Sequence, residues 1–145
     1  QIIQGLETVS LRMEKHCSNA AKVAEYLSNH NKVSRVIYAG LDEGEAGERA
    51  NKYLKGGHGA LCGIELKGGK ASGEKFINNL NMFYHVANIG DARSLAIHPA
   101  STTHSQLSDE DMESAGVNPS YVRLSIGIEH IDDIIEDLKN ALDAA

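Results

Sequence analysis

The chain has 145 residues, of which 41% are hydrophobic and 23% are charged, and its formal net charge is -6. This composition is typical of a globular domain with enough chain for one core. The net negative charge and the lack of a lysine and arginine cluster argue against nucleic acid or an anionic membrane as a partner. No apolar run approaches the roughly 18 residues of a membrane span, and the sequence does not start with a signal region. We therefore expect one cytoplasmic domain that contacts neither nucleic acid nor membrane.

Residues 1–29 are predicted to form one long helix. Apolar residues recur three or four apart, which places them on one stripe that would face a core: Leu6, Val9, Met13, Cys17, Ala20, Ala24 and Leu27. Ile2, Ile3 and Leu11 lie outside this stripe. A second apolar face indicates packing against something outside this chain, although a helix buried on two sides is an equal alternative. Because the sequence starts with Gln1 and is helical at once, we interpret it as cut from a longer protein.

The middle of the chain alternates between β-rich and helical runs. Three segments dominated by β-branched or alternating apolar residues are predicted strands: residues 33–38, 60–66 and 94–97. Three segments are predicted helices: residues 48–54, 71–79 and 108–116. The acidic stretch 42–48 predicts an exposed loop. The glycine-rich stretch 56–59 is interpreted as a turn, since it lacks the Gly-Lys-Ser/Thr and the following helix of a phosphate-binding loop.

The last third of the chain contains clear helix and turn signals. Ser108 precedes Asp111 by three residues, which is the pattern of a capped helix start. Residues 118–119 predict a turn into a strand at 122–127. Residues 131–142 predict an amphipathic helix, with Asp132 and Asp133 in the first turn, where the helix dipole favours acidic side chains. Together these elements predict an α+β fold, an open sheet of about four strands with helices packed on one face.

The two cysteines, Cys17 and Cys62, are far apart and lack the Cys-x-x-Cys spacing of a redox or metal site. Each falls on the apolar phase of its own predicted element. We therefore interpret both as small buried hydrophobic residues, and we do not expect a disulfide in a chain that we place in the cytoplasm.

Arg123 is the main candidate for a binding residue. It alternates with Val122 and Leu124 at the two-residue period of a strand, so its side chain is predicted to point away from the core. A guanidinium presents its donors in a fixed fork that suits a carboxylate or phosphate. An ordinary surface arginine on an exposed strand is the alternative.

Other chemistries are less well supported by the pattern. His98 and His104 lie close in sequence but not at helical ligand spacing, and the loop between them offers hydroxyls rather than thiolates or carboxylates to a metal. A hydrolase built from Asp91, His104 and Ser101 or Ser125 would lack the Gly-x-Ser-x-Gly turn. We expect the two histidine rings to bind backbone carbonyls and so to fix a proline-containing loop.

Two runs of residues resemble a known family. They are GDARSLAIHPASTTHS at residues 90–105 and VRLSIGIE at residues 122–129, and an acidic amphipathic tail follows them. They resemble the carboxy-terminal part of the cysteine and methionine metabolism enzymes that use pyridoxal phosphate (PLP), and most closely the O-acetylhomoserine sulfhydrylase branch. The resemblance extends from residue 4 to the end. It implies that residues 1–145 are the C-terminal small domain of a fold-type I PLP-dependent transferase, with residues 1–29 linking it to a large N-terminal domain.

The resemblance also implies roles for individual residues. In this family the arginine of the Arg-Leu-Ser run binds the substrate's α-carboxylate, which here is Arg123. The residue two before the Gly-Asp pair lies at the same carboxylate and is Asn88 here, where related lyases tend to carry serine. Thr103 would line the same pocket. The lysine and the phosphate-binding groups that hold pyridoxal phosphate belong to the large domain, so we expect no catalytic or cofactor-binding residue, and no activity, in this chain alone.

The implied reaction is a γ-replacement, in which O-acetylhomoserine and sulfide, or a thiol, give homocysteine, or methionine, and acetate. The implied assembly is a homotetramer. Other members of the family are alternatives, namely cystathionine γ-synthase, cystathionine γ-lyase and methionine γ-lyase. A non-catalytic module that binds an amino acid for regulation is a further alternative, and it would bind its ligand without the cofactor.

Overall fold

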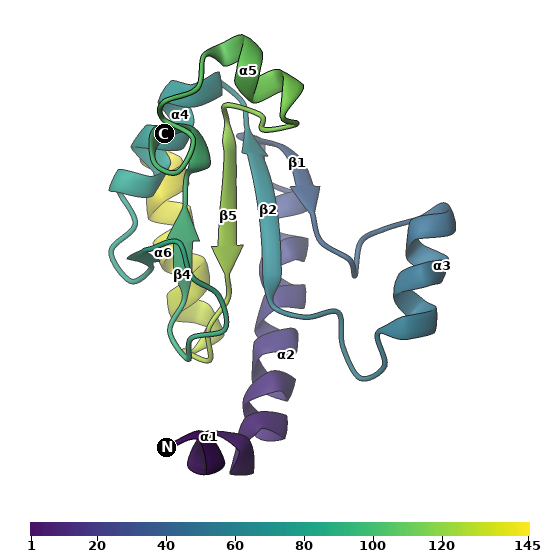
Figure 1. The fold of residues 1–145 in the computed structure, drawn as a ribbon. Helices are drawn as coiled ribbons and strands as arrows, with labels where there is room; N and C mark the ends of the chain where they lie inside the picture. Colours follow the sequence, from purple (N-terminus) through teal and green to yellow (C-terminus); the bar gives the residue numbers. More distant parts are fainter.

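The computed structural model describes residues 1–145, except for the side chains of Asp109 and Glu113. Within this described part the strands form a five-stranded sheet with the order β1-β2-β5-β4-β3. They are β1 (Val33–Ile37), β2 (Leu61–Leu66), β3 (Tyr84–His85), β4 (Leu95–Ile97) and β5 (Tyr121–Ser125). Neighbouring strands are antiparallel apart from the parallel pair β3 and β4. The sheet is therefore mixed and open, and β5 lies between β2 and β4 (Figure 1).

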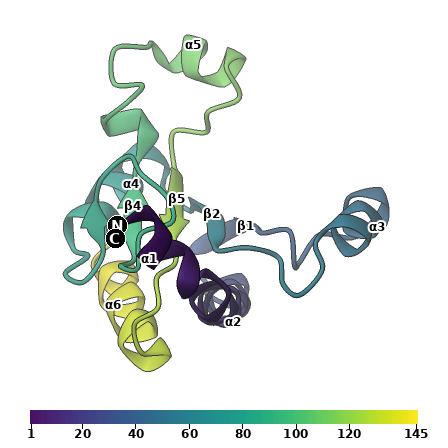
Figure 2. The same ribbon diagram turned by 60° about the horizontal axis from the view of Figure 1, so that its bottom comes forward.

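The helices are divided between the two sides of this sheet. They are α1 (Ile2–Glu7), α2 (Val9–Ser28), α3 (Gly44–Tyr53), α4 (Gly69–Asn78), α5 (Asp109–Ser114) and α6 (Ile131–Ala144), with the 3-10 turn η1 (Pro99–Ser101). Helices α2 and α6 pack on each other behind the sheet, and α4 packs on α6 and β5. Figure 2 shows α5 on the opposite side from α2 and α6, and α3 apart from the sheet beyond β1.

The hydrophobic core lies between the sheet and the layer of α2, α4 and α6. On β5, Val122 and Leu124 are fully buried, and they face buried residues such as Leu27, Phe76 and Leu138 from the three helices. The two-residue period of a strand turns Arg123 to the other face. This arrangement confirms the predicted α+β class. The expected layer of helices on one face consists of α2, α4 and α6, whereas α5 lies on the other side.

The expected number of strands was about four, and the structure has one more. The additional strand is the two-residue β3, which pairs with β4 between Tyr84 and Leu95 and between His85 and Ala96. Such a short exposed segment has no sequence period of its own, so pairing with β4 defines it.

Two helix boundaries differ from the predictions. The long helix expected over residues 1–29 is interrupted at Thr8, whose backbone leaves the helical region, so α1 and α2 are separate. The loop expected over residues 42–48 is largely helical, because α3 begins at Gly44. Glu45 lies in the first turn of α3, where an acidic side chain is stabilised by the helix dipole.

The first half of the predicted apolar stripe is exposed. Leu6, Val9 and Met13 are between 41% and 63% exposed, whereas Ala20, Ala24 and Leu27 are fully buried. Figure 1 shows the reason, since the first turns of α2, together with α1, extend below the end of the sheet. The expectation that the stripe packs along its whole length is therefore wrong for this chain.

The predicted state of the cysteines is half right. Cys62 is fully buried on β2, but Cys17 is partly exposed on α2, so it is not the buried residue that we expected. Both thiols are free. Cys17 faces the loop after α3, where a Cβ on Gly57 would lie 2.7 Å from its sulfur.

Local signals in the second half of the chain are confirmed. Ser108 Oγ accepts the backbone N–H of Asp111, which is the cap expected at the start of α5, and the same hydroxyl donates to the Asp111 carboxylate. Asp132 and Asp133 lie in the first turn of α6. Within the described residues, no helix combines the length and the apolar character that crossing a membrane would need.

Candidate functional site: a pocket on the open face of the sheet

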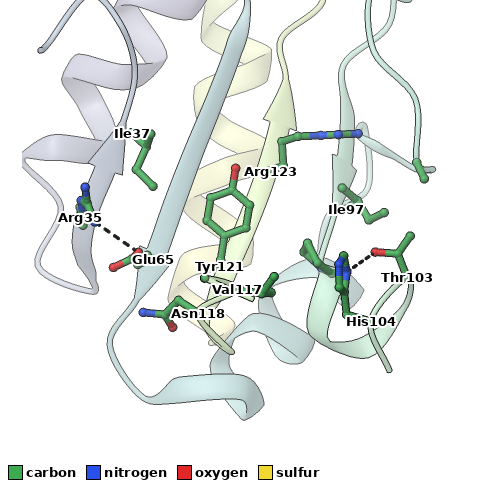
Figure 3. Close-up of a pocket in the computed structure, with 13 residues that line it drawn as sticks. Arg35, Ile37, Glu65, Ile97, Thr103, His104, Val117, Asn118, Tyr121 and Arg123 are labelled. Atoms are coloured by element: carbon green, nitrogen blue, oxygen red, sulfur yellow. Dashed lines mark hydrogen bonds and ion pairs between the residues drawn. The ribbon is translucent and has the colours of Figure 1, made fainter. Parts of the chain in front are cut away.

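A pocket of about 510 Å³ opens on the sheet face that the helical layer leaves uncovered. The strands supply its floor, and residues 97–118, which lead from β4 through η1 and α5, supply its wall. Its lining residues are Arg35, Ile37, Glu65, Ala87, Ile97, Pro99, Thr103, His104, Gly116, Val117, Asn118, Tyr121 and Arg123. Figure 3 shows that they come from separate parts of the chain, so the sheet and the long β4 to β5 connection form the pocket together.

Arg123 projects from β5 into this pocket, as its position in the strand predicts. Its side chain extends across β4, over Ile97 (Figure 3). Nη2 of Arg123 donates to the backbone carbonyl of Asn88 at 3.1 Å. Among the residues whose side chains the structure describes, Arg123 forms no ion pair. The guanidinium is thus oriented by a neutral acceptor and keeps further N–H groups for an anion.

The second arginine of the pocket is already paired. Arg35 on β1 lies 3.8 Å from the Glu65 carboxylate on β2, and the strand register places these residues opposite each other. The Glu65 side chain is largely buried, whereas that of Arg35 is 67% exposed. A single anion that enters the pocket therefore meets the full charge of Arg123 and the compensated charge of Arg35.

Tyr121 lies between the two arginines and was not among the predicted site residues. Its ring covers Gly63 on β2, where a Cβ would lie 2.5 Å from the ring, so only glycine leaves room for it. Burial raises the pKa of Tyr121, and the nearby charge of Arg123 partly opposes that rise. The phenol is therefore neutral near pH 7, and its ring forms the wall of the pocket beside Arg123.

The structure brings the three predicted site residues to one region. Asn88 contacts Arg123 through its backbone carbonyl, while its side-chain oxygen accepts the N–H of Ile89 at 2.8 Å. Thr103 lies across the pocket, where its hydroxyl is 2.9 Å from Nδ1 of His104 (Figure 3). Whether these residues bind substrate stays a prediction, but their positions are compatible with it.

The histidines differ from each other. His98 is fully buried, and its ring nitrogens lie 2.8 Å from the Pro119 carbonyl and 2.8 Å from Ser101 Oγ, so it fixes the loop as expected. His104 instead bonds to the Thr103 hydroxyl and lines the pocket, so the expectation of a backbone carbonyl partner is wrong for it.

The proposed hydrolase set is not assembled. Ser101 is bound to His98, and Ser125 accepts the N–H of Gly90, so neither hydroxyl is paired with His104. The Asp91 carboxylate accepts the N–H of Arg93. Across the described part of the chain, no three His, Cys, Asp or Glu side chains come together in a way that would hold a metal ion.

Comparison with known proteins assigns the chain to a family. The profile of the family described as Cys/Met metabolism PLP-dependent enzyme matches residues 1–143. The chain belongs to this family. The match confirms the predicted family, whose members depend on pyridoxal phosphate.

The similar proteins include both a sulfhydrylase and a lyase of this family. The chain is 54% identical over 143 residues to an O-acetyl-L-homoserine sulfhydrylase of Leptospira meyeri, covering 98% of this chain and 32% of that protein. It is 44% identical over 142 residues to an L-methionine gamma-lyase of Fusobacterium nucleatum, covering 98% of this chain and 36% of that protein. The chain thus spans about a third of the length of these relatives.

A solved structure confirms the fold. It is described as an O-acetylhomoserine (thiol)-lyase of Campylobacter jejuni with N'-pyridoxyl-lysine-5'-monophosphate. The TM-score is 0.87 at 42% identity, and the match covers 97% of this chain and 33% of that one.

The pocket residues of this chain do not by themselves fit pyridoxal phosphate. The cofactor's aldehyde forms a Schiff base with a lysine amine, and no lysine lines the described pocket. Nor does the amino terminus of a helix open into the pocket to receive a phosphate. The polar groups that are present, above all Arg123, suit a carboxylate instead.

Proposed function

We propose that this chain is the C-terminal domain of an O-acetylhomoserine sulfhydrylase and that its Arg123 binds the α-carboxylate of the substrate. The observation that carries the proposal is a guanidinium on a rigid central strand, oriented by the Asn88 carbonyl and without an ion-pair partner among the described side chains. Arg123 can therefore form a charge-assisted, bidentate contact with a carboxylate.

Rigidity makes this contact useful for catalysis. β5 is the third of five strands and is hydrogen bonded on both sides, so the base of Arg123 has little freedom. A carboxylate held at two points fixes the orientation of the whole amino acid, and binding energy is then converted into alignment of the reacting bond. Asn88, whose carbonyl accepts Arg123 Nη2, and Thr103, which lines the pocket with Arg123, are proposed as further substrate contacts.

The proposed overall reaction replaces the acetate of O-acetylhomoserine by sulfide, or by a thiol, and gives homocysteine, or methionine. The 54% identity to a sulfhydrylase supports this branch over the lyases of the family. Because the pocket does not fit pyridoxal phosphate alone, we propose that the groups that hold the cofactor lie in the larger part of the enzyme. This chain would then be inactive on its own.

The surface of the first helices supports a partner domain. Ile2, Ile3 and Leu11 are 82%, 74% and 68% exposed, and exposed apolar residues of this kind mark an interaction surface when they lie close together. We propose that α1 and the start of α2 join this domain to the remaining two thirds of a protein as long as the relatives. The predicted homotetramer and cytoplasmic location stay predictions.

The proposal is tested by turnover of O-acetylhomoserine with sulfide in the full-length enzyme that contains this chain. Arg123→Ala should lower kcat/KM by about a hundredfold or more, because a charge-assisted bidentate contact is lost. Arg123→Lys should lose much of the same activity, since it keeps the charge without the fork. Arg35→Ala is the matched control, because this arginine lines the same pocket but is paired with Glu65, and we expect less than about a threefold change.

Each alternative gives a different result. A wild-type enzyme that cleaves methionine but does not use O-acetylhomoserine would belong to the lyase branch, with the anchor still in place. Equal effects of the Arg123 and Arg35 substitutions would remove Arg123 as the anchor. A regulatory module would be favoured if this chain bound an amino acid in the absence of cofactor and the full-length protein showed no turnover.

A further inference from the structure

Residues 88–94 run alongside the end of β5 and the residues that follow it. Every second residue of the segment 88–94 is hydrogen bonded to β5 or to the residues after it. The N–H of Gly90 donates to Ser125 Oγ at 3.2 Å, and the N–H of Ile128 donates to the carbonyl of Ala92 at 2.9 Å. The segment is therefore held along its length rather than only at its ends.

The end of this segment is fixed by the Glu129 carboxylate. Its two oxygens accept the backbone N–H of Ser94 at 2.6 Å and the Ser94 hydroxyl at 3.0 Å. The same hydroxyl oxygen accepts the N–H of Gly127 at 2.9 Å. Ser94 is fully buried, and a carboxylate only accepts hydrogen bonds, so each proton in this cluster has one defined direction.

The residues around Glu129 are in turn fixed to helix α2. Nδ2 of Asn19 donates to the carbonyls of Gly127 and Glu129 at 3.0 and 2.9 Å. Nδ1 of His16 donates to the carbonyl of Ile126 at 2.6 Å. Asn19 and His16 are both buried in the helical layer. The Glu129 carboxylate thus has a fixed place relative to the core, and it transmits that place to residues 88–94.

Gly127 is closely surrounded by the atoms of this cluster. A Cβ on Gly127 would lie 2.2 Å from the Glu129 carboxylate, 2.5 Å from the Ser94 nitrogen and 2.6 Å from the Ala92 carbonyl oxygen. Backbone atoms on one side and the carboxylate on the other therefore surround this glycine. A side chain at this position would collide with the cluster, so its hydrogen bonds require glycine here.

We propose that Glu129 is a positioning residue for the carboxylate anchor, an inference that rests on the proposed function of Arg123. Through Ser94, Glu129 holds the segment whose first carbonyl, that of Asn88, accepts Nη2 of Arg123. When the segment shifts, the guanidinium loses the acceptor that orients it and the substrate carboxylate meets a displaced fork. A displaced fork contacts the carboxylate at one point instead of two, so the substrate is bound less tightly.

The test is Glu129→Gln in the full-length enzyme. Glutamine has the same shape, but it places an NH2 group where one carboxylate oxygen accepts the Ser94 hydroxyl. That hydroxyl already accepts the Gly127 N–H, so its own proton loses its acceptor. We expect KM for O-acetylhomoserine to rise about tenfold with kcat changed far less, which is the pattern of weaker substrate binding. Ser94→Ala removes the same link from the other side and should give the same pattern.

Asp137→Asn is the matched control. Asp137 is a buried carboxylate that, like Glu129, accepts backbone N–H groups, here those of Asn81, Met82 and Phe83, but it does not line the pocket. It reports what the loss of such a carboxylate does to stability alone. We expect a similar fall in Tm for Asp137→Asn and Glu129→Gln, with KM raised only in the latter.

A double-mutant cycle with Arg123→Ala separates this inference from the proposed function. If Glu129 acts through Arg123, Glu129→Gln should lower kcat/KM little further once Arg123 is alanine. If Arg123→Ala alone is impaired but Glu129→Gln leaves KM as Asp137→Asn does, the positioning role is refuted and the anchor stands. If Arg123→Ala is itself unaffected, the proposed function fails first. Full additivity of the two substitutions would also refute action through Arg123.

Discussion

Asp137 on α6 makes the sharpest test of the fold, and we predict that Asp137→Ala destabilises this chain strongly. One carboxylate oxygen accepts the N–H of Asn81 at 2.9 Å, and the other accepts those of Met82 at 3.0 Å and Phe83 at 3.4 Å. These bonds fix the chain between α4 and β3 to the last helix. Alanine removes all three acceptors together.

The magnitude follows from the surroundings of the three donors. A hydrogen bond to a charged group contributes about 1.5–3 kcal/mol. Asn81 is exposed, so its N–H can bond to water after the change, whereas Phe83 is buried and its N–H stays without an acceptor. Counting the bonds to Met82 and Phe83 at the lower end of this range, and leaving out the bond to Asn81, gives a loss of about 3 kcal/mol.

Urea unfolding followed by far-UV circular dichroism measures this loss. Asp143→Ala on the same helix is the control, since residue 143 is exposed, and it should change stability by less than about 0.5 kcal/mol. A loss of less than about 1 kcal/mol for Asp137→Ala would show that water replaces the carboxylate at these donors, and the reasoning from burial would be wrong.

Two further predictions concern thiol reactivity and pH. Burial raises the pKa of Cys62 to about 12, so a thiol reagent at pH 8 should label Cys17 in the native chain and Cys62 only in urea. Equal labelling rates of the two cysteines in the native chain would contradict this. Burial lowers the pKa of His98 from its ordinary 6.5, partly opposed by its bond to Pro119, so the unfolded chain takes up more protons below about pH 6.5. This part of the stability is present above pH 6.5 and is lost as the pH falls. The free energy of unfolding of His98→Gln should therefore depend less on pH between pH 7 and 5. An unchanged dependence would exclude His98 as the cause.

Features that depend on neighbouring residues could be predicted from the sequence. The direction of Arg123 follows from its alternation with Val122 and Leu124, and the cap of α5 follows from Ser108 and Asp111 three residues apart. Both need only local geometry, and both are confirmed. The resemblance in residues 90–105 and 122–129 identified the family for the same reason, since it lies in short continuous runs.

Features that depend on strand pairing could not be predicted in this way. Arg35, Glu65 and Tyr121 are separated by 30 residues or more in sequence and become neighbours only through the register of β1, β2 and β5. Tyr121 did carry a signal, because it precedes Arg123 by two residues and so lies on the same face of its strand. The contact between Glu129 and Ser94 has no sequence signal, since it requires residues 88–94 to fold back along β5.

The exposed apolar start of the chain shows a different limit. The periodicity of residues 6–27 correctly predicts one stripe, but not which part of the stripe this chain buries. Leu6 and Leu27 have equal weight in the pattern, yet one is 63% exposed and the other fully buried. The periodicity identifies the apolar face of the helix. How much of that face is buried depends on how far the sheet extends along the helix.

The connection between β4 and β5 has a consequence for how the pocket can change. These strands are neighbours in the sheet, yet the long connection of residues 98–120 joins them. The hydrogen bond from His98 to the Pro119 carbonyl closes the base of this connection. Changes in its length beyond that closure add little entropic penalty, because loop closure depends only weakly on length. Insertions or deletions within residues 101–117 would thus reshape one wall of the pocket while the strand that carries Arg123 keeps its partners. Selection for a new substrate side chain can act on this wall separately from the carboxylate contact.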